Sequence, residues 1–477
     1  MLFTSFNFFV LVAIAFGLYY STKKQKLQIL ILIIASFIFY AWNFPALLLL
    51  LLLSIAINAI SSYGITTTGD KNLRKIYATL GVVLNLAILG FFKYSPLIGH
   101  TFFEDKSTIG QFLVSIPLPI GISFFTFQGI SLVIDTFTGK ELVLTESHGN
   151  KFSTHLAKVT LFKAFFPQLV AGPIVKAHEF LPQIKSKFLS NIEWEFCFRN
   201  LVAGYFLKMV VADNLKEQTY WITYPWFSNV SLSGLLTLLF GYSMQIFADF
   251  AGYSLIAIGL AALFGYRLMD NFLFPYISTS FSEFWRRWHI SLSNFLKEYL
   301  YIPLGGNRKG RVRTYINLMI TMMLGGLWHG AAWSYAVWGT YHGALLASER
   351  FLKESFNPKP LNLPKNVILI IKGILVFTAV SFGWLLFKLP NFDHVIKYLQ
   401  AMIHNVFFLN QDIDIMFFVA IYSLPVVIYH FLYLYKEGKN SSGYKSLQRL
   451  EPIIYGTMLF MLISNSGSSG DFIYFQF

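Results

Sequence analysis

Long apolar runs separated by short polar loops dominate the chain. Six runs approach the ~20 residues that a helix needs to cross the hydrocarbon of a bilayer, at residues 6–20, 27–42, 46–60, 77–92, 367–387 and 415–435. Shorter or interrupted apolar runs lie between them, so we expect roughly ten to twelve membrane helices, some incomplete or re-entrant. The pattern predicts an all-α polytopic membrane protein with re-entrant and interfacial helices around a central cavity. No long linker divides it, which predicts one integral-membrane domain over residues 1–477.

Composition and charge support this interpretation. Of the 477 residues, 55% are hydrophobic and 13% charged, and the net charge is +14. The basic residues gather in short loops at 23–26, 71–75, 306–313, 350–365 and 436–445. Placing all of them in the cytoplasm satisfies the positive-inside rule, so we expect a cytoplasmic (inner) membrane location, both termini on the outer face, and membrane lipid rather than nucleic acid as a partner. With a single cysteine, Cys197, no internal disulfide can form.

Residues 279–301 combine polar and apolar positions at helical spacing. Ser280 and Glu283 have the spacing of a capping box, which marks a helix start. An apolar stripe then follows at three- and four-residue intervals, which predicts one amphipathic helix in the membrane interface that ends near Pro303. Arg286 and Arg287 would be available to phosphates, and His289 would lie at the edge of the stripe.

The stretch "MMLGGLWHGAAW" places His329 among glycines between two basic loops. The residues from Thr314 to Glu349 are too few for two full spans and a turn, which need at least ~40. Either two tight spans or a re-entrant hairpin, broken near Gly325, Gly326 and Gly330, fits the length. A histidine at this depth either packs helices or lines a cavity. The glycines favour a cavity, because they allow close approach to a ligand. His342 has weaker support.

Two further features carry polar groups into apolar surroundings. Tyr242, Gln245, Asp249 and Gly252 share one face of an apolar helix, where a structural hydrogen-bond network explains the Asp249 carboxylate better than catalysis does. The tail 471–477, "DFIYFQF", is too aromatic to stay in water and must dock on membrane or protein. An interfacial anchor is one explanation for it.

Several motifs of soluble enzymes are absent. There is no G-x-S-x-G elbow, H-E-x-x-H pair, P-loop or dinucleotide fingerprint, so serine-hydrolase, zinc and nucleotide-motor activities have no support. We expect no bound cofactor or metal. The residues alone leave two classes: an acyltransferase, or a transporter or flippase with a histidine-lined route.

Several segments together resemble one family. "FWRRWHISLSNFLKEYLYIPLGGNRKG", "NLMITMMLGGLWHGAAW" and "WGTYHGALLASER" are similar to the signature core of the membrane-bound O-acyltransferases, in the branch of the alginate and peptidoglycan O-acetyltransferase membrane subunits. Upstream, "LPIGISFFTFQGISLVIDTFTGK" and "FFPQLVAGPI" continue the likeness, which is strong over roughly residues 1–350. It implies a catalytic core at about 115–350.

This resemblance implies roles for individual residues. His329 would be the catalytic histidine and His289 the second histidine of the site. A desolvated imidazole suits removal of a proton from a hydroxyl at neutral pH; our hypothesis assigns that step to His329, with His289 or Asn294 holding the acyl carbonyl or the acceptor. Asp249, Arg286, Arg287 and Trp328 are substrate-binding candidates, with acetyl-CoA as the expected acyl donor.

The resemblance also extends to the tail and to a partner. F-x-Y-x-x-F is similar to a terminal motif in relatives whose tyrosine takes the acyl group, so Tyr474 is a candidate covalent relay beside the anchor explanation. An outer-face partner of the acetyltransferase or esterase-like kind would then acetylate an exported or cell-wall polysaccharide. D-alanyl transfer to teichoic acid is an alternative within the same family.

Overall fold

The computed structural model describes residues 1–477 apart from 105–106, 141–150, 171, 356–362, 408–409, 439–441, 469–471 and 473–477. Within these described ranges every regular element is helical, which confirms the all-α prediction. The chain forms two compact units, Met1–Leu201 with Ser254–Met269 and Val202–Tyr253 with Asp270–Phe477. Helix α12, Leu232–Leu263, contributes to both. Whether the chain acts as one domain stays a prediction.

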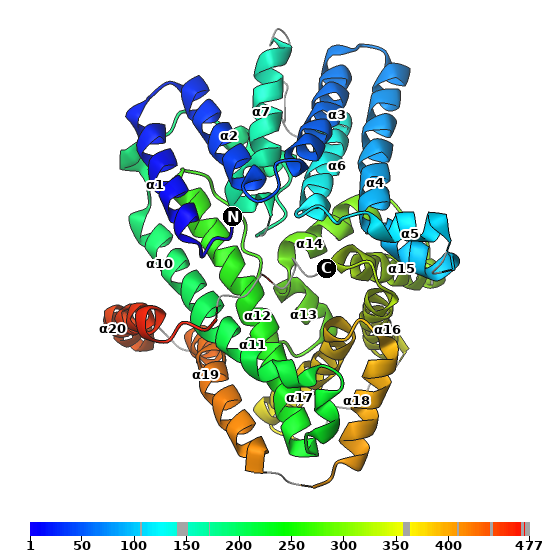
Figure 1. Cartoon of the computed structure of the whole chain (residues 1–477), viewed down its shortest axis with the longest axis vertical. Helices are drawn as coiled ribbons and strands as arrows, with labels where there is room; N and C mark the ends of the chain where they lie inside the picture. The colour runs from blue at the N-terminus through cyan, green and yellow to red at the C-terminus, as the bar shows by residue number, and fades with distance from the viewer. Residues whose placement is uncertain are drawn as a thin grey trace. The chain divides into compact units, whose positions relative to one another are not determined.

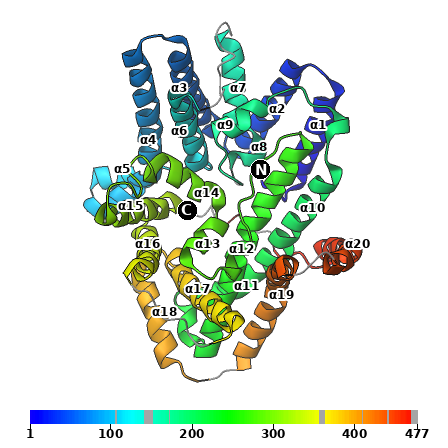
Figure 2. The ribbon, with the colours of Figure 1, turned by 180° about the vertical axis from the view of Figure 1, so that it is seen from behind.

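The first unit consists of helices from the first half of the chain (Figure 1). Their bounds are α1 Phe6–Ser21, α2 Gln25–Ala41, α3 Leu47–Thr67, α4 Lys71–Phe102, α5 Thr108–Ser115, α6 Ile122–Thr138, α7 Phe152–Ala164, α8 Phe166–Leu169, α9 Ala177–Phe180 and α10 Trp194–Tyr205. Helices α3, α4 and α6 contact one another and lie side by side in both views (Figures 1 and 2). As the prolines predict, regular helix stops soon after Pro167.

Polar side chains hold this unit together inside apolar helices. Asn58 and Asn85 exchange side-chain hydrogen bonds of 3.1 and 3.0 Å between α3 and α4. Gly129 of α6 lies directly against both amides, where any Cβ would collide with them. Lys163 donates to the Ser54 hydroxyl at 2.6 Å. In hydrocarbon such bonds stabilise helix contacts, because no water is present there to form hydrogen bonds with an unpaired polar group.

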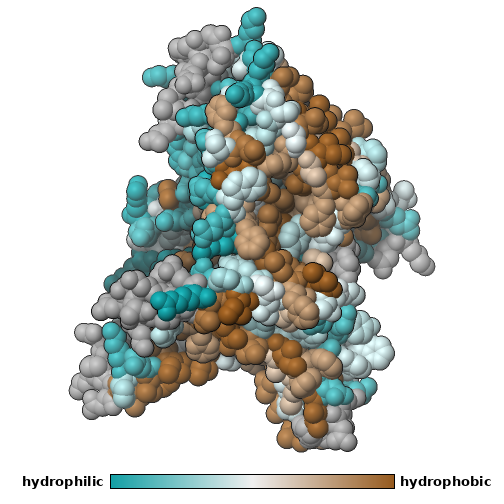
Figure 3. All heavy atoms as spheres, turned by 90° about the vertical axis from the view of Figure 1, so that its left-hand side faces the viewer, coloured by the Kyte–Doolittle hydropathy of each residue, from teal (hydrophilic) through white to brown (hydrophobic). Residues whose placement is uncertain are grey.

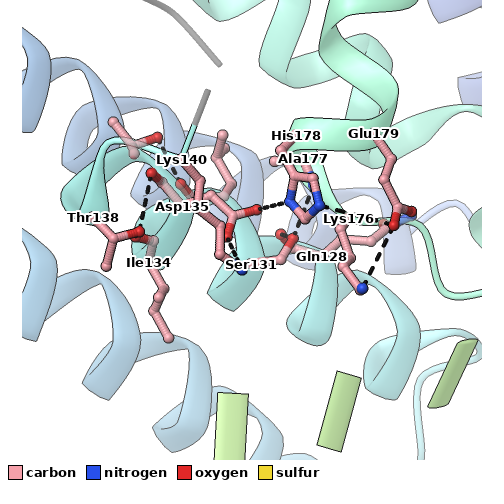
Figure 4. Close-up of polar contacts among 12 residues, drawn as sticks. Gln128, Ser131, Ile134, Asp135, Thr138, Lys140, Lys176, Ala177, His178 and Glu179 are labelled. Atoms are coloured by element: carbon pink, nitrogen blue, oxygen red, sulfur yellow. Dashed lines mark hydrogen bonds and ion pairs between the residues drawn. The ribbon is translucent and has the colours of Figure 1, made fainter. Parts of the chain in front are cut away.

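A second polar cluster joins α6 to α9 (Figure 4). The buried Asp135 carboxylate and Nδ1 of His178 are 2.8 Å apart, and the Ala177 N–H donates to Ser131 at 3.3 Å. Lys140 adds a longer ion pair with Asp135 at 3.8 Å. Asp135, in the last turn of α6, therefore ties that helix to α9.

The second unit holds the elements that carry the predicted site residues. After the π-helical stretch η4, Phe206–Ala212, come α11 Asp213–Thr219, α12, the short turn η7 Pro275–Ile277, α13 Phe281–Arg287, α14 Ile290–Leu296, the π-helical stretch η8 Lys297–Tyr301, α15 Arg311–His329, α16 Trp333–Ser355, α17 Lys365–Lys388, α18 Phe392–His404, α19 Asn410–Gly438 and α20 Ser442–Ser464. Figure 2 shows α15 to α18 from behind. Helices α15 and α16 form the most extensive helix pair of the described chain.

Five described helices are long and apolar enough to cross a membrane: α3, α4, α12, α17 and α19. Three shorter apolar helices, α1, α2 and α6, accompany them. Large apolar side chains stay exposed in number, such as Ile374 at 61% and Phe431 at 64%, and Figure 3 shows them in broad tracts on the face that it presents. The chain is a multi-pass membrane protein. The count of ten to twelve spans stays a prediction.

Candidate functional site

The helical hairpin α15–α16 carries His329. Of the two arrangements that the length allowed, the structure has two regular helices with a tight turn. The chain leaves the helix only at Gly330–Ala332, so the predicted break at Gly325 and Gly326 is wrong. His329 is the last residue of α15, is 3% exposed, and faces inward beside the turn.

The glycines of this hairpin serve mainly helix contact. A Cβ on Gly326 would overlap the carbonyl oxygen of Tyr335, and one on Gly339 would overlap that of Met322. A Cβ on Gly330 would strike the Tyr335 ring. Small residues let helix backbones approach closely in this way. Only Gly325 lines a cavity, and even there a Cβ would come 2.9 Å from the end of the Leu296 side chain.

His289 lies at a break in what was predicted to be one amphipathic helix. Ser280 caps α13 as expected, and its hydroxyl accepts from the Glu283 N–H at 3.1 Å. The helix then ends at Arg287, and His289 takes a left-handed conformation with φ 44° before α14 begins. The continuous-helix prediction is therefore wrong. His289 is 1% exposed, well inside rather than at the edge of the stripe.

Neighbouring backbone satisfies this break. The Ile290 N–H donates to the Asn271 carbonyl at 2.9 Å, and the Leu273 N–H donates to the Arg287 carbonyl at 2.9 Å. The Asn271 side chain accepts from the Ser291 hydroxyl at 2.9 Å. Helix ends leave backbone groups without partners, and at depth these must be paired by protein. The segment that precedes α13 thus fixes where His289 points.

The two histidines lie close together. Their ring centroids are 6.1 Å apart, and the Trp328 ring lies 5.8 Å from His289 and 5.1 Å from His329. Trp338 contacts His329 from the other helix of the hairpin at 5.1 Å. The structure therefore brings together His289, Trp328 and His329, which the sequence singled out from two separate stretches.

A groove of about 700 Å³ reaches His329 along the inner face of α15. Its walls also include α14, η8 and one tryptophan each from α13 and α16, and its lining comprises Trp285, Leu292, Ser293, Leu296, Lys297, Tyr301, Leu318, Thr321, Met322, Gly325, His329 and Trp338. From Leu318 to His329 the helix rises about 16 Å. One end thus lies at His329 and the other near the exposed basic loop 306–313.

The other candidates on α13 and α14 differ in their surroundings. Arg287 is held by the Glu283 carboxylate at 3.0 Å and by the Leu273 carbonyl at 3.2 Å, whereas Arg286 is exposed. Asn294 is half-buried beside the groove-lining Ser293. Burial alone would raise the pKa of Glu283, but hydrogen bonds from Thr279 and Arg287 lower it overall. Arg287 is therefore engaged in holding α13, and Arg286 is the better placed of the two for a phosphate.

Asp249 belongs to a buried ion cluster. Lys208 of η4 lies 2.8 Å from the Asp249 carboxylate and 2.8 Å from that of Asp213, and all three side chains are at most 5% exposed. The structural-network interpretation fits this geometry. Lys208 and Asp213 were missed from the sequence because five residues separate them, a spacing that places two side chains on different faces of an α-helix. The π-helical stretch η4 brings them together, and nothing in the sequence indicates it.

The tail reaches this region, although Tyr474 and most of 471–477 lie outside the described residues. Asn465 and Gly467 bond to α11 and η4: the Gly467 N–H donates to the Met209 carbonyl at 2.9 Å. Phe472 is 2% exposed, with ring centroids 4.1 Å from Tyr253 and 5.3 Å from Phe250. Phe250 in turn lies 6.1 Å from His289.

Comparison with known proteins decides the family. The model of the membrane-bound O-acyltransferase family matches residues 36–389. The chain belongs to this family. Among relatives, a probable alginate O-acetylase AlgI of Pseudomonas aeruginosa is 37% identical over 416 residues, 84% of this chain and 75% of that protein. A peptidoglycan O-acetyltransferase of Helicobacter pylori is 34% identical over 78% of this chain and 73% of its own.

A more distant relative widens the range of acyl groups within the family. A teichoic acid D-alanyltransferase of Bacillus subtilis is 29% identical over 58% of this chain and 70% of its own length. Together with the O-acetyltransferases, it supports O-acyl transfer in the membrane. This member of the membrane-bound O-acyltransferase family is therefore an O-acyltransferase, and the acyl group and acceptor that it uses are matters of proposal.

The groove holds functional candidates that sequence reasoning missed. Ser293, Lys297 and Tyr301 line one wall at four-residue spacing, and Thr321 lines another. Their four-residue spacing was a usable signal, but it was read as part of an amphipathic helix in the membrane interface. Within the described residues, no group of His, Cys, Asp and Glu side chains is arranged to hold a metal ion.

Proposed function

We propose that this O-acyltransferase takes an acetyl group from acetyl-CoA on the cytoplasmic side and passes it across the inner membrane for O-acetylation of an exported or cell-wall polysaccharide. One observation carries the proposal: His329 ends the groove, with the His289 ring 6.1 Å away, while the other end opens near basic side chains. A thioester donor has the same polarity, with phosphates at one end and an acyl group at the other.

The chemistry assigned to His329 is general-base catalysis. Its imidazole takes the proton of an incoming hydroxyl, whose oxygen attacks the thioester carbonyl; the C–S bond breaks, and the thiolate leaves with that proton. His289 or Asn294 positions the carbonyl or the acceptor. The apolar groove wall of Leu292, Leu296 and Leu318 excludes water that would otherwise hydrolyse the donor.

The donor phosphates are assigned to the exposed cations around the groove mouth. Arg308, Lys309 and Arg313 are exposed, and Arg286 offers a further guanidinium. Charge reversal at Arg308 and Arg313 together should raise KM for acetyl-CoA and leave kcat nearly unchanged. Reversal at Lys71 and Lys75, two exposed lysines at the start of α4, is the control. Equal KM in both double variants would argue against a phosphate site at 306–313.

For the acceptor we propose Tyr474, outside the described residues. The support is the described part of the tail: Phe472 is buried against Phe250, whose ring lies 6.1 Å from that of His289. Its phenol oxygen takes the acetyl group, and the aryl ester then gives it to an outer-face partner of the acetyltransferase or esterase-like kind. The transfer is thereby divided into two acyl exchanges.

The decisive experiment is the intact mass of the C-terminal peptide after incubation of purified protein with acetyl-CoA. Wild type should gain one acetyl group, and both His329→Ala and Tyr474→Phe should not. Phe472→Ala, which removes the buried anchor and keeps the nucleophile, should reduce the gain. Acetyl-CoA turnover without any mass gain would mean direct transfer to a partner or polymer, and the tail would be only an anchor.

The topology completes the proposal. We place loops 71–75 and 306–313 in the cytoplasm and both termini outside, following the positive-inside rule. Single cysteines are introduced at Lys71 and Arg308 of a Cys197→Ser variant. An impermeant maleimide should label them only after the inner membrane has been permeabilised. Labelling of either in intact spheroplasts would reverse the orientation and remove the cytoplasmic donor.

A further inference from the structure

A second groove, of about 500 Å³, lies in the same unit and is separate from the histidine pair. Helices α12, α17 and α19 and the turn η7 form its walls, through residues that include Phe240, Met244, Tyr276, Phe377, Val427 and His430. Apart from His430 and the tyrosine hydroxyl, these named side chains are apolar. No step of the proposed acyl transfer uses this groove.

The surroundings of the groove indicate what fills it. Three of its walls, α12, α17 and α19, are candidate membrane spans. Beside it, Leu236 is 46% exposed, Ile374 61% and Phe431 64%. Surfaces of this kind on spanning helices face hydrocarbon, and an apolar crevice that opens there holds a lipid chain more favourably than water.

His430 adds a polar requirement. Its Nδ1 lies 2.8 Å from the Val426 carbonyl oxygen. A carbonyl only accepts, so Nδ1 carries the proton and Nε2 is left with a lone pair. His430 is 5% exposed, and among the residues that the structure describes Nε2 has no hydrogen-bond partner. The stacked Tyr276 cannot supply one, because its hydroxyl already donates to the Ser243 carbonyl.

An unpaired acceptor in an apolar site is costly, so the occupant should bring a donor. Position along α19 suggests where that donor comes from. His430 is five residues before Tyr435, the last residue of the candidate span Asp412–Tyr435, or about 8 Å along the helix axis. Glycerol and headgroup hydroxyls of a bilayer lie near such a boundary.

The charge nearby favours an anionic headgroup. One turn beyond His430, the Arg287 guanidinium lies 5.6 Å from the centre of the Tyr433 ring, although it is also paired with Glu283. The basic stretch 436–445 follows directly along the chain. The chain as a whole carries +14. Positive charge at a membrane boundary attracts anionic lipid. Among common bilayer lipids, phosphatidylglycerol combines a negative phosphate with hydroxyl donors.

We propose that this groove is a phosphatidylglycerol site, in which one acyl chain lies between α12, α17 and α19 and a headgroup hydroxyl donates to Nε2 of His430. The site is independent of the acyl-transfer proposal. It requires only the full chain in a bilayer, and its test does not depend on enzyme activity.

Photocrosslinking tests the site. The full-length protein is placed in nanodiscs that contain phosphatidylglycerol, phosphatidylethanolamine and phosphatidylcholine, with a diazirine on the acyl chain of one lipid at a time. The phosphatidylglycerol probe should label peptides from α12, α17 and α19 about fivefold more than the phosphatidylcholine probe, the ratio that one hydrogen bond gives. Equal labelling by these two probes, or stronger labelling by the phosphatidylethanolamine probe, would overturn the proposal.

Three variants locate the label. Val427→Trp fills the groove and should abolish labelling there, whereas Ile428→Trp, at the next and more exposed position, should retain it. His430→Phe replaces the imidazole with an apolar ring of similar size. It should leave labelling by the phosphatidylcholine probe unchanged and remove the preference for phosphatidylglycerol. If Val427→Trp does not fold, His430→Phe decides alone: a preference that survives in it would overturn the proposal.

Discussion

The two buried histidines are presented by opposite means. His329 closes a regular helix, and glycines that let two helices touch hold it in place. His289 sits in a left-handed break in the chain, held by backbone bonds to residues 271–273. The position of His329 depends on the small size of the glycines where α15 and α16 touch. The position of His289 depends on hydrogen bonds to a neighbouring irregular segment. A precise site is thus assembled from one part that is rigid by packing and one that is rigid by hydrogen bonding.

The largest effect should come from removal of the His329 imidazole. His329→Ala should lower acetyl transfer by about 10²–10⁴-fold, the usual contribution of a general base, without loss of folded protein. His404→Ala, at an exposed position on α18, is the control and should be fully active. Turnover of acetyl-CoA in detergent measures both. An active His329→Ala would reduce this histidine to a packing residue.

His289 allows backbone and side chain to be separated. His289→Gly keeps the left-handed conformation without strain, and His289→Ala does not; such strain is worth roughly 1–2 kcal/mol. Both variants lose the buried ring, so we expect the glycine variant to unfold at a higher temperature than the alanine variant. It should still lose about 10²-fold in activity, as when one oxyanion donor is removed.

The comparison between these two variants is informative in either direction. Full activity in His289→Gly would show that only the bend matters, and the second histidine would drop out of the chemistry. Activity and stability that fall in parallel in both variants would show that the imidazole acts through folding.

The glycine seam, which is the close contact of α15 with α16 at Gly326 and Gly339, can be tested by adding one methyl group. Gly326→Ala should destabilise the hairpin by about 1–3 kcal/mol, because the new Cβ overlaps the Tyr335 carbonyl and the helices must separate. Gly373→Ala on α17, where nothing lies within 4 Å of a Cβ, should be neutral or slightly stabilising. Thermal unfolding in one detergent compares them. An equal loss of thermal stability in both variants would mean that the helices are not in tight contact at Gly326.

The smallest effect concerns the start of α13, where Glu349 of α16 accepts from the Phe281 N–H at 2.6 Å and the Ser282 N–H at 3.1 Å. Burial alone would raise the pKa of Glu349, but hydrogen bonds from Lys353 and Ser282 lower it overall. A lowered pKa stabilises the fold above the ordinary value of ~4.3 and ceases to do so as the pH falls below it. Acidification below pH ~4.3 should therefore loosen α13.

The matching variant is Glu349→Gln, which should cost about 1 kcal/mol at neutral pH, as the loss of a helix cap does, and should flatten the acid response. Lys353→Met keeps the cap on Phe281 and Ser282, so it should change stability little at neutral pH and reduce the acid response only in part. Thermal unfolding midpoints between pH 7 and pH ~3, below the ordinary pKa of a glutamate, measure both. A Glu349→Gln protein with unchanged acid sensitivity would place that sensitivity elsewhere.

Apolar runs and glycine spacing were enough to predict helices, the membrane and His329 as a candidate, whereas the pairing of His329 with His289 came from the family resemblance. They did not predict the break at His289, because nothing in "RRWHIS" interrupts helical periodicity; the bonds to Asn271 and Leu273 are tertiary and override local preference. Nor did they predict that Gly326 faces a helix rather than a ligand, since both uses place the same residue in the same pattern. Asp249 was recognised as part of a structural network. Its partner Lys208 was not, because the side chain of a lysine on a helix normally extends into water.

The π-helical stretch η8 has a practical meaning for anyone who wishes to change the substrate of this enzyme. Such a stretch holds one residue more than an α-helix of the same length, and here it places Lys297 and Tyr301 in the groove wall. Deleting one residue would turn the following side chains by about 100° while α15 and its glycine seam stay unaltered. For the proposed donor groove, a mutant library of such length variants should therefore reshape this wall more than a library of substitutions does.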